Sequence, residues 1–248
     1  MLESKKILIT GASRGIGRAI ALACARERAA VGISYRDSED QAKSLQKEIA
    51  SRYETEAMLL PFDVRDPVAA GKAVDFFSGE SDRIDGLVNC AGIFRPGLLV
   101  SLPPGEIEEQ IAVNLLGAIH CAQAALPSMI QQRSGVILNV SSVAAIRPNR
   151  GQAVYAASKG ALESLTRALA VEYARKGIRF LCLRPGPVDT DMMAGTKVLG
   201  EEEILARTPL RRLGKPEEIA DLAVYLLSEK AEYITGSTHT IDGGYLEG

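Results

Sequence analysis

The chain has 248 residues, of which 46% are apolar, and its formal net charge at pH 7 is −2. This length and composition suffice for one large buried core, so we expect a single domain over residues 1–248. The near balance of charges gives no support to nucleic-acid binding, which needs a clustered basic surface. No apolar run reads as a signal peptide or as an 18-residue membrane span, so we also expect no membrane partner.

The cysteines and histidines give little support to a metal site. His120 and His239 belong to no metal-ligand spacing, so we expect two structural histidines and no metal. The cysteines lie in separate apolar segments and form no CxxC pair, which is typical of reduced core thiols in a cytoplasmic protein. They are Cys24, Cys90, Cys121 and Cys182.

A short apolar strand over 7–10 leads into a glycine-rich turn and then an alanine-rich helix to about Arg28. Gly11, Gly15 and Gly17 stand in the order GxxxGxG, which differs from the GxGxxG dinucleotide fingerprint. The physical requirement is the same, because the backbone must approach a pyrophosphate closely and present it to a helix N-terminus. Alone, three glycines between a strand and a helix also fit a tight turn, so nucleotide binding needs support from other residues.

The second strand, over 30–35, ends where an acidic side chain would bind the adenosine ribose of NAD. Tyr35 stands there instead, Arg36 follows it, and Arg14 lies in the glycine-rich turn. Two guanidinium groups could converge on a 2′-phosphate with the forked hydrogen bonds of arginine, which favours NADP. The alternatives are that both arginines are solvated, or that Asp37 serves a ribose because the strand ends later.

Strands and helices continue to alternate along the chain. A polar helix over 38–53 leads to a third strand over 57–61, and the next helix begins near Pro67. Asp63, between them, is a candidate N-cap of that helix. This alternation predicts a parallel sheet covered by helices on both faces.

A fourth strand over 85–90 is followed by two consecutive helices over 98–133. Asn89, at the end of this strand, is expected to bond backbone across the central strands and to be structural. Asn114 lies in the second helix, where its amide has no obvious partner among apolar neighbours. A core asparagine with satisfied hydrogen bonds is the alternative.

The chemistry is expected in residues 139–160, which run from a buried strand through a loop into a helix. The strand delivers Ser142 to the rim of the sheet, where open α/β folds bind their ligands. Tyr155 and Lys159, four residues apart, share one face of the helix. A nearby cation lowers the pKa of a phenol, and Ser142 could hydrogen-bond the same substrate oxygen, so the three predict a proton donor with its helpers. The alternative is a solvated helix face, where this spacing is common.

Ser142, the run Tyr155-Ala-Ala-Ser-Lys159 and the glycine-rich turn resemble the short-chain dehydrogenase/reductase family over essentially the whole chain. The closest pattern within it is the 3-oxoacyl-[acyl-carrier-protein] reductase group. The resemblance implies one doubly wound Rossmann-type domain of about seven strands in the order 3-2-1-4-5-6-7. The dinucleotide would be bound mainly by residues 5–92, catalysis would fall mainly within 110–190, and a lid would cover the substrate over about 190–210.

The resemblance also implies a role for each catalytic residue. Tyr155 would protonate the substrate oxygen, Ser142 would steady that oxygen, and Lys159 would hold the nicotinamide ribose and lower the pKa of Tyr155. Asn114 would perturb its helix and hold a water that relays protons from Lys159. Cofactor contacts, including Asp63 at the adenine and Val188 and Thr190 at the nicotinamide carboxamide, would come from Gly11, Ser13, Arg14, Gly15, Ile16, Gly17, Arg36, Asp63, Val64, Asn89, Ala91, Gly92, Tyr155, Lys159, Pro185, Gly186, Val188 and Thr190.

The last third of the chain contains a strand over 178–183 that prolines should end abruptly. A mixed segment over 192–209 with Gly195 and Gly200 suits a mobile lid. A helix over 216–228 and a strand and turn over 238–244 complete the chain.

Taken together, the resemblance implies NADPH-dependent reduction of a 3-oxoacyl thioester on acyl carrier protein by a homotetramer. Its interfaces would involve the long helices and the turn at Gly243 and Gly244. Arg133 and Lys176 would dock the acidic carrier beside the active-site mouth, or would simply complement the dipoles of the helices they end. An NAD-dependent alcohol or sugar dehydrogenase and a catalytically idle subunit are the competing functions.

Overall fold

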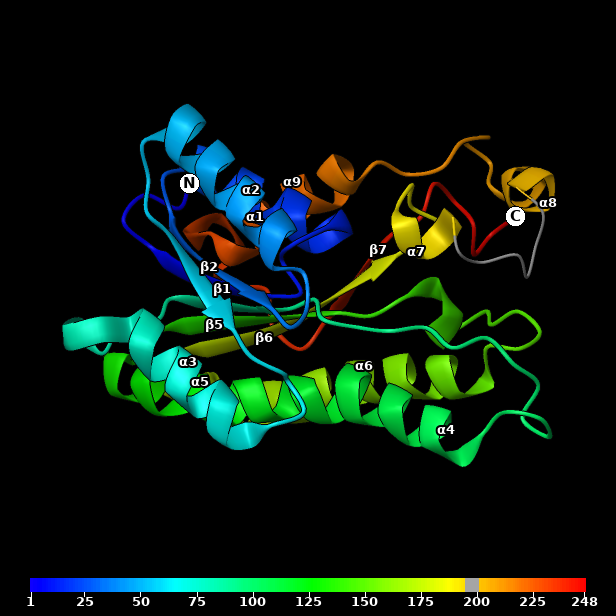
Figure 1. Cartoon of the computed structure of the whole chain (residues 1–248), viewed down its shortest axis with the longest axis horizontal. Coiled ribbons are helices and arrows are strands. Elements are labelled where there is room, and N and C mark those ends of the chain that lie inside the picture. Colours follow the sequence, from blue (N-terminus) through cyan, green and yellow to red (C-terminus); the bar gives the residue numbers. More distant parts are fainter. Residues whose placement is uncertain (195–200) are drawn as a thin grey trace.

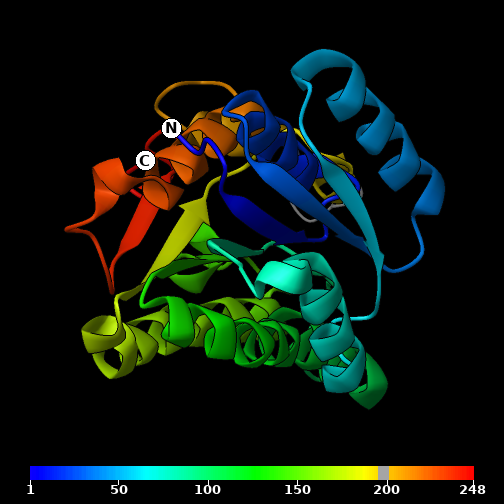
Figure 2. The ribbon, with the colours of Figure 1, turned by 90° about the vertical axis from the view of Figure 1, so that its left-hand side faces the viewer.

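The computed structural model describes residues 1–194 and 201–248. Within these residues, seven parallel strands form one sheet in the order β3-β2-β1-β4-β5-β6-β7, which confirms the expected doubly wound fold and strand order. Helices cover both faces of this sheet (Figures 1 and 2). The strands are β1 (Lys6–Thr10), β2 (Ala30–Tyr35), β3 (Ala57–Pro61), β4 (Gly86–Asn89), β5 (Gly135–Val140), β6 (Ile178–Pro185) and β7 (Thr238–Ile241).

The helices divide into two layers, and Figure 1 shows α1, α2 and α9 on one face of the sheet and α3 to α6 on the other. The short helices α7 and α8 lie at one edge, toward the chain's C-terminus. The helices of the described residues are α1 (Gly15–Arg26), α2 (Glu39–Tyr53), α3 (Pro67–Ser78), α4 (Pro104–Ile111), α5 (Gly117–Gln132), α6 (Ala153–Tyr173), α7 (Asp191–Ala194), α8 (Glu201–Arg207) and α9 (Pro216–Leu227).

Two hydrophobic cores result from this sandwich, because successive strand residues point to opposite faces. On β1, Ile7 and Ile9 join the core under α1 and α9, whereas Leu8 joins the core under α3 and α5. Both faces are buried, so the central strands have nearly continuous apolar sequences. The register aligns Thr10 with Asn89, and Asn89 with Asn139, so the carboxyl ends of β1, β4 and β5 meet at one edge.

Strand β6 is two residues longer than expected. Arg184 pairs with Thr240 and Pro185 with Ile241, so the proline does not end the strand. A proline is tolerated where the ladder does not need its N–H, and here the next amide, that of Gly186, donates to the carbonyl of Ile241 at 2.9 Å. The extension carries the Pro-Gly segment over the edge of the sheet.

The two helices expected within 98–133 form one continuous stretch, Pro104–Gln132, with a π-helical turn at Ala112–Leu116 between α4 and α5. By length and composition alone, this 29-residue stretch is apolar enough to cross a membrane, which the sequence analysis did not note. However, 56% of its most apolar window is buried inside the fold, as in the core helix of a globular domain.

The four cysteines are free thiols, and three of them are buried. Across residues 1–194 and 201–248, no three His, Cys, Asp or Glu side chains come together as metal ligands.

Candidate active site

A cavity of about 760 Å³ opens at the carboxyl edge of the sheet. It extends from Arg36 and Asp63, past the glycine-rich turn, to Ser142 and Tyr155. Of the residues expected at the site, Asn89 and Asn114 do not line this cavity and the rest do. Residues from opposite ends of the chain therefore meet where parallel strands end, as the fold requires.

The glycines of the turn are needed for close packing and for space. A Cβ on Gly17 would lie 2.3 Å from the carbonyl oxygen of Gly11, and one on Gly11 would lie 2.8 Å from Cα of Ala91. Gly15 has a positive φ of 55°, and a Cβ there would meet only the methyl group of Thr190, at 3.5 Å. A side chain at Gly15 would thus fill space in front of α1.

Helix α1 begins directly behind this space. Its N-cap, Arg14, makes no side-chain cap, and its first turn holds no acidic residue. Free amides and the positive end of the helix dipole at such a terminus form a binding site for a phosphate. The turn therefore fits the pyrophosphate of a dinucleotide.

Both arginines expected at the 2′-phosphate line the cavity and are exposed. Arg36 is ion-paired, because its Nε donates to Asp37 at 2.5 Å and one Nη lies 3.9 Å from Asp63. Arg14 makes no ion pair within the described part of the chain. A third arginine, Arg65, donates to both carboxylate oxygens of Asp63, and this hydrogen bonding lowers the pKa of that carboxyl.

Asp63 does not cap the following helix, as its position had suggested. Asp66 does so, because its Oδ1 accepts hydrogen bonds from the amides of Val68 and Ala69 at 2.9 and 3.1 Å. An aspartate at this position of α3 satisfies two of the free N–H groups of its first turn. Asp63 is left in the cavity wall.

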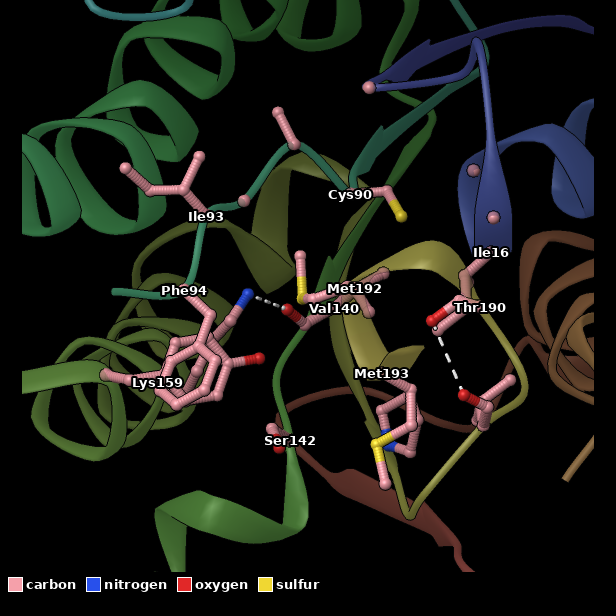
Figure 3. Close-up of a pocket in the computed structure, with 18 of the residues that line it drawn as sticks. Ile16, Cys90, Ile93, Phe94, Val140, Ser142, Lys159, Thr190, Met192 and Met193 are labelled. Carbon is pink, nitrogen blue, oxygen red and sulfur yellow. Dashed lines mark hydrogen bonds between the residues drawn. The ribbon is translucent and has the colours of Figure 1, made fainter. Parts of the chain in front are cut away.

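Ser142 and Lys159 lie near the end of β5 (Figure 3), and Tyr155 lies close to both of them. Ser142 is the second residue after β5, and Tyr155 and Lys159 come from the first two turns of α6. The ammonium of Lys159 lies 5.8 Å from the centre of the Tyr155 ring and donates to the carbonyl of Val140 at 2.8 Å. Lys159 is buried, and this burial lowers the pKa of its ammonium.

Burial raises the pKa of Tyr155 to about 12, and a hydrogen bond from Ser142 acts in the opposite direction. The Lys159 ammonium is directed at the Val140 carbonyl, and burial is the main cause of the raised pKa of the phenol. That Lys159 lowers the pKa of Tyr155 stays a prediction. Tyr155 therefore holds its proton throughout the neutral pH range.

Asn114 lies in the π-helical turn, and its amide is satisfied. Its Oδ1 accepts from the amide of Ile93 at 2.8 Å, and its Nδ2 donates to the carbonyl of Ile93 at 2.9 Å and to Ser158 at 3.1 Å. The expectation of an amide without a partner was wrong, and the alternative of a satisfied core asparagine holds. Asn114 joins the π-helical turn to α6 and to the loop that follows β4.

Asn89 has the structural position that its sequence context indicated. Its Nδ2 donates to Asn139 at 2.9 Å, and Asn139 in turn donates to Thr166 on α6 at 3.0 Å. These bonds connect β4, β5 and the catalytic helix through the interior. The Oδ1 atom of Asn89 is buried without a partner among the described atoms.

Known proteins resemble this chain over nearly its full length. The profile of the family described as "Enoyl-(Acyl carrier protein) reductase" matches residues 11–246. The 3-oxoacyl-[acyl-carrier-protein] reductase of Thermotoga maritima is 40% identical, over 98% of each chain. That of Staphylococcus aureus is 37% identical, over 98% of this chain and 99% of the relative.

The chain belongs to the short-chain dehydrogenase/reductase family. Solved structures agree, among them a short-chain dehydrogenase of Burkholderia cenocepacia in complex with NADP, with a TM-score of 0.91, 35% identity and 99% of each chain covered. A gluconate 5-dehydrogenase of the same organism, in complex with NADP and tartrate, has a TM-score of 0.93 and 32% identity, and covers 100% of this chain and 97% of the relative.

In this short-chain reductase the loop after β6 closes one side of the cavity. Asp189 donates from its backbone to Gly214 at 2.9 Å, and Gly214 donates to Pro187 at the same distance, so two segments support each other. The hydroxyl of Thr190 turns back to the carbonyl of Val188 at 3.4 Å (Figure 3). Val188 and Thr190 both border the cavity, where their polar groups could hold a carboxamide.

Several residues of the cavity were not found from the sequence. Phe94 packs edge to face against Tyr155, with ring centres 5.0 Å apart and planes at 61°. Met193, Ile204 and Tyr245 also line it, from segments with no recognised motif. An aromatic residue two positions after Asn-Cys-Ala-Gly was the available signal for Phe94.

The lid expected over about 190–210 is described only in part. Gly195 and Gly200 lie outside the described residues, whereas α7 and α8 on either side of them are helical. Met192 and Met193 of α7 and Ile204 of α8 reach the cavity, and the labelled methionines in Figure 3 lie opposite Phe94 and Lys159.

Proposed function

We propose that this enzyme uses NADPH to reduce 3-oxoacyl thioesters to 3-hydroxyacyl thioesters. The observation that carries the proposal is a phenol in the cavity wall, Tyr155, that keeps its proton at neutral pH beside the hydroxyl of Ser142. The reductases of Thermotoga maritima and Staphylococcus aureus, named for this reaction, match the chain over nearly its full length. Bound NADPH supplies the hydride.

The chain's own residues supply binding, orientation and a proton. Ser142 is placed to donate a hydrogen bond to the substrate carbonyl oxygen, which becomes more negative as the carbonyl is reduced. Tyr155 then transfers its proton to that oxygen, and a phenol with a pKa of about 12 gives its proton only to a base as strong as a developing alkoxide. Phe94 fixes the orientation of the Tyr155 ring by its edge-to-face contact.

We assign cofactor binding to the residues expected from the sequence. The glycine-rich turn and the N-terminus of α1 would hold the pyrophosphate, and Arg14 with Arg36 the 2′-phosphate. Two neighbours in fold, both from Burkholderia cenocepacia, were solved in complex with NADP, which supports this choice. Lys159 is proposed to bind the nicotinamide ribose, and Asn114 to hold Ile93 and Phe94 in place.

The positions of Arg133 and Lys176 bear on carrier-protein docking. Arg133 caps α5 just before β5, and Lys176 precedes β6, so both lie at the amino edge of the sheet. Ser142 follows the other end of β5, which at about 3.3 Å per residue is roughly 20 Å away. The expectation that they lie beside this chain's own active-site mouth was therefore wrong.

The two residues remain candidates for docking at the mouth of a second copy. The backbone segments that carry them lie side by side, since a Cβ on Gly177, the residue after Lys176, would lie 2.0 Å from the carbonyl oxygen of Arg133. Both side chains are exposed, and neither makes an ion pair with any described residue. We propose that they bind the acidic carrier in a homotetramer, where another copy's cavity faces them, and that the enzyme is cytoplasmic, as its free thiols suggest.

The decisive experiment follows NADPH oxidation by the purified protein with 3-oxobutanoyl thioesters of acyl carrier protein and of coenzyme A. We expect turnover of both, and no turnover of the matched 2-enoyl thioester, which the description of the matching family would favour. Gluconate with NADP tests the activity named for a structural neighbour. Turnover of the enoyl thioester or of gluconate, without turnover of the 3-oxo compound, would overturn the proposal.

A further inference from the structure

Beyond Tyr155 the cavity has two unlike ends. Arg95, Pro96 and Met192 are exposed and form an open rim. Val143 and Tyr245, by contrast, are buried and form a closed apolar end. A long polar handle such as a carrier-bound arm has to leave through the open rim. The acyl chain of the substrate then points into the closed end.

Tyr245 dominates the closed end. It is only 2% exposed and is the largest fully buried side chain among the described residues. Its ring belongs to the same hydrophobic cluster as Val143, the residue directly after Ser142, and Ile204 of α8. The ring therefore stands close to the position that the reacting carbonyl must take beside Ser142.

Polar contacts hold the Tyr245 ring in place. Its hydroxyl accepts a hydrogen bond from Nδ2 of Asn149 at 3.2 Å. The guanidinium of Arg147 lies 5.8 Å from the ring centre and donates to the backbone carbonyl of Tyr245 at 3.0 Å. A buried tyrosine whose ring and hydroxyl are both engaged has little freedom to move aside.

The backbone before Tyr245 is equally constrained. The carboxylate of Asp242 accepts from the amides of Gly244 and Leu246 at 2.9 and 3.0 Å, which folds the chain into a tight turn. Gly243 and Gly244 both have positive φ, and a Cβ on Gly186 would lie 2.6 Å from Asp242. The turn thus rests on the loop after β6, in the wall of the same cavity.

We propose that Tyr245 is the end wall of the acyl site and restricts this enzyme to short 3-oxoacyl chains. This inference rests on the proposed reduction of 3-oxoacyl thioesters and adds a chain-length limit to it. Apart from Arg147 and Asn149, the residues packed around the ring are apolar, namely Val143, Met193, Ile204, Leu213 and Leu246. If the ring is removed, the space left has a mainly apolar wall against which an alkyl group can be buried.

The test compares Tyr245→Ala with the wild type on 3-oxoacyl thioesters of four, six, eight and ten carbons with one common handle. The wild type is expected to lose kcat/KM steeply beyond the shortest chains. In Tyr245→Ala the ratio of kcat/KM for eight carbons to that for four should rise by at least tenfold. Burial of each further methylene group contributes roughly a fourfold gain.

Three further variants distinguish the loss of the end wall from a general loss of structure. Tyr245→Phe keeps the ring, so it should keep the wild-type chain-length profile even if its overall rate falls. Tyr233→Ala removes a tyrosine that is completely exposed and should also leave the profile unchanged. Ile204→Ala enlarges the same end of the cavity from α8 and should favour longer acyl chains. It therefore provides a second test of the end wall if Tyr245→Ala does not fold.

The outcomes are distinct. An unchanged chain-length profile in both Tyr245→Ala and Ile204→Ala overturns the proposal that Tyr245 is the end wall. A wild type that accepts all four chain lengths equally overturns it as well. A wild type that reduces none of the 3-oxoacyl thioesters instead overturns the proposed function itself.

Discussion

Glu163 and Arg184 form a buried ion pair between the catalytic helix and β6. Their side chains are 5% and 15% exposed, and Arg184 donates to both carboxylate oxygens of Glu163, at 2.5 and 2.8 Å. Ser141 adds a hydrogen bond to Glu163 at 2.9 Å, and Arg184 reaches Thr240 on β7 at 3.0 Å. The pair ties α6, which carries Tyr155 and Lys159, to three adjacent segments of the sheet.

Removing one partner of this pair should therefore be costly. We expect Glu163→Leu or Arg184→Leu alone to lower the free energy of unfolding by about 3–5 kcal/mol, because each leaves an unpaired buried charge. The double variant should recover much of the loss, since it buries no charge. Urea unfolding of the four proteins measures this, and additive losses in the double variant would contradict the coupling.

Tyr155→Phe should keep cofactor binding and lose turnover. The substitution removes the proton donor and preserves the ring that Phe94 contacts, so reduction should slow by about 10²–10⁴. Fluorescence titration with NADPH is the control for binding. A Phe variant that kept more than about a tenth of wild-type activity would exclude Tyr155 as the acid.

The high pKa of Tyr155 gives a defined pH dependence. Because burial favours the neutral phenol, Tyr155 should release its proton only near pH 12, and the rate of reduction should not fall between pH 6 and 9 through loss of this proton. The difference in absorbance at 295 nm between wild type and Tyr155→Phe follows the phenolate. A midpoint below the ordinary tyrosine value of about 10 would mean that Lys159, and not burial, controls this group.

Arg14 and Arg36 should determine the choice between NADPH and NADH. Replacing both with alanine removes the charged hydrogen bonds to a 2′-phosphate, each worth about 1.5–3 kcal/mol. The preference for NADPH, expressed as a ratio of kcat/KM values, should fall by at least tenfold. Lys215→Ala offers a control, because it removes one positive charge outside the cavity. If the wild type already used both cofactors equally well, the assignment of the arginines would be wrong.

Carrier docking predicts an effect that depends on the substrate's handle. Arg133→Glu with Lys176→Glu should raise KM for carrier-bound substrate, more strongly at low salt, and should leave a free thioester unaffected. Light scattering on the same variant tests whether the oligomer persists. Equal losses on both handles would indicate damaged helices, and no loss on either would remove these residues from the docking surface.

The sequence predicted features that depend on local pattern. The alternation of apolar runs and helices predicted a parallel sheet covered on both faces, and the glycines at a strand–helix junction predicted the turn before α1. The order of the strands came from the family resemblance. Contacts between segments far apart in the chain could not be predicted from the sequence. Nothing in the sequence distinguished Glu163 from other helix residues or Arg184 from other strand residues. The ring of Tyr245 could be placed only from the structure, which brings the final turn to Ser142 and Val143.

The sequence did not predict the directions in which side chains and helix ends point. Tyr155 and Lys159 do share a helix face, but spacing alone does not say that the ammonium turns to Val140. Likewise, Arg133 and Lys176 were placed correctly at helix ends, yet a linear pattern does not reveal which edge of the sheet those ends occupy.

The strand order has a consequence for how the chain acquires its structure. Strand β1 lies between β2 and β4, and Thr10 pairs with Asn89, about 80 residues later. At roughly 5–20 residues per second, a ribosome needs about 4–16 s to make the intervening segment. During that time β1 has an unpaired hydrogen-bonding edge, which can join another nascent chain. The contacts that bring the glycine-rich turn against Ala91 thus cannot form until β4 has been made, and until then the newly made N-terminal part of the chain is exposed to misassociation.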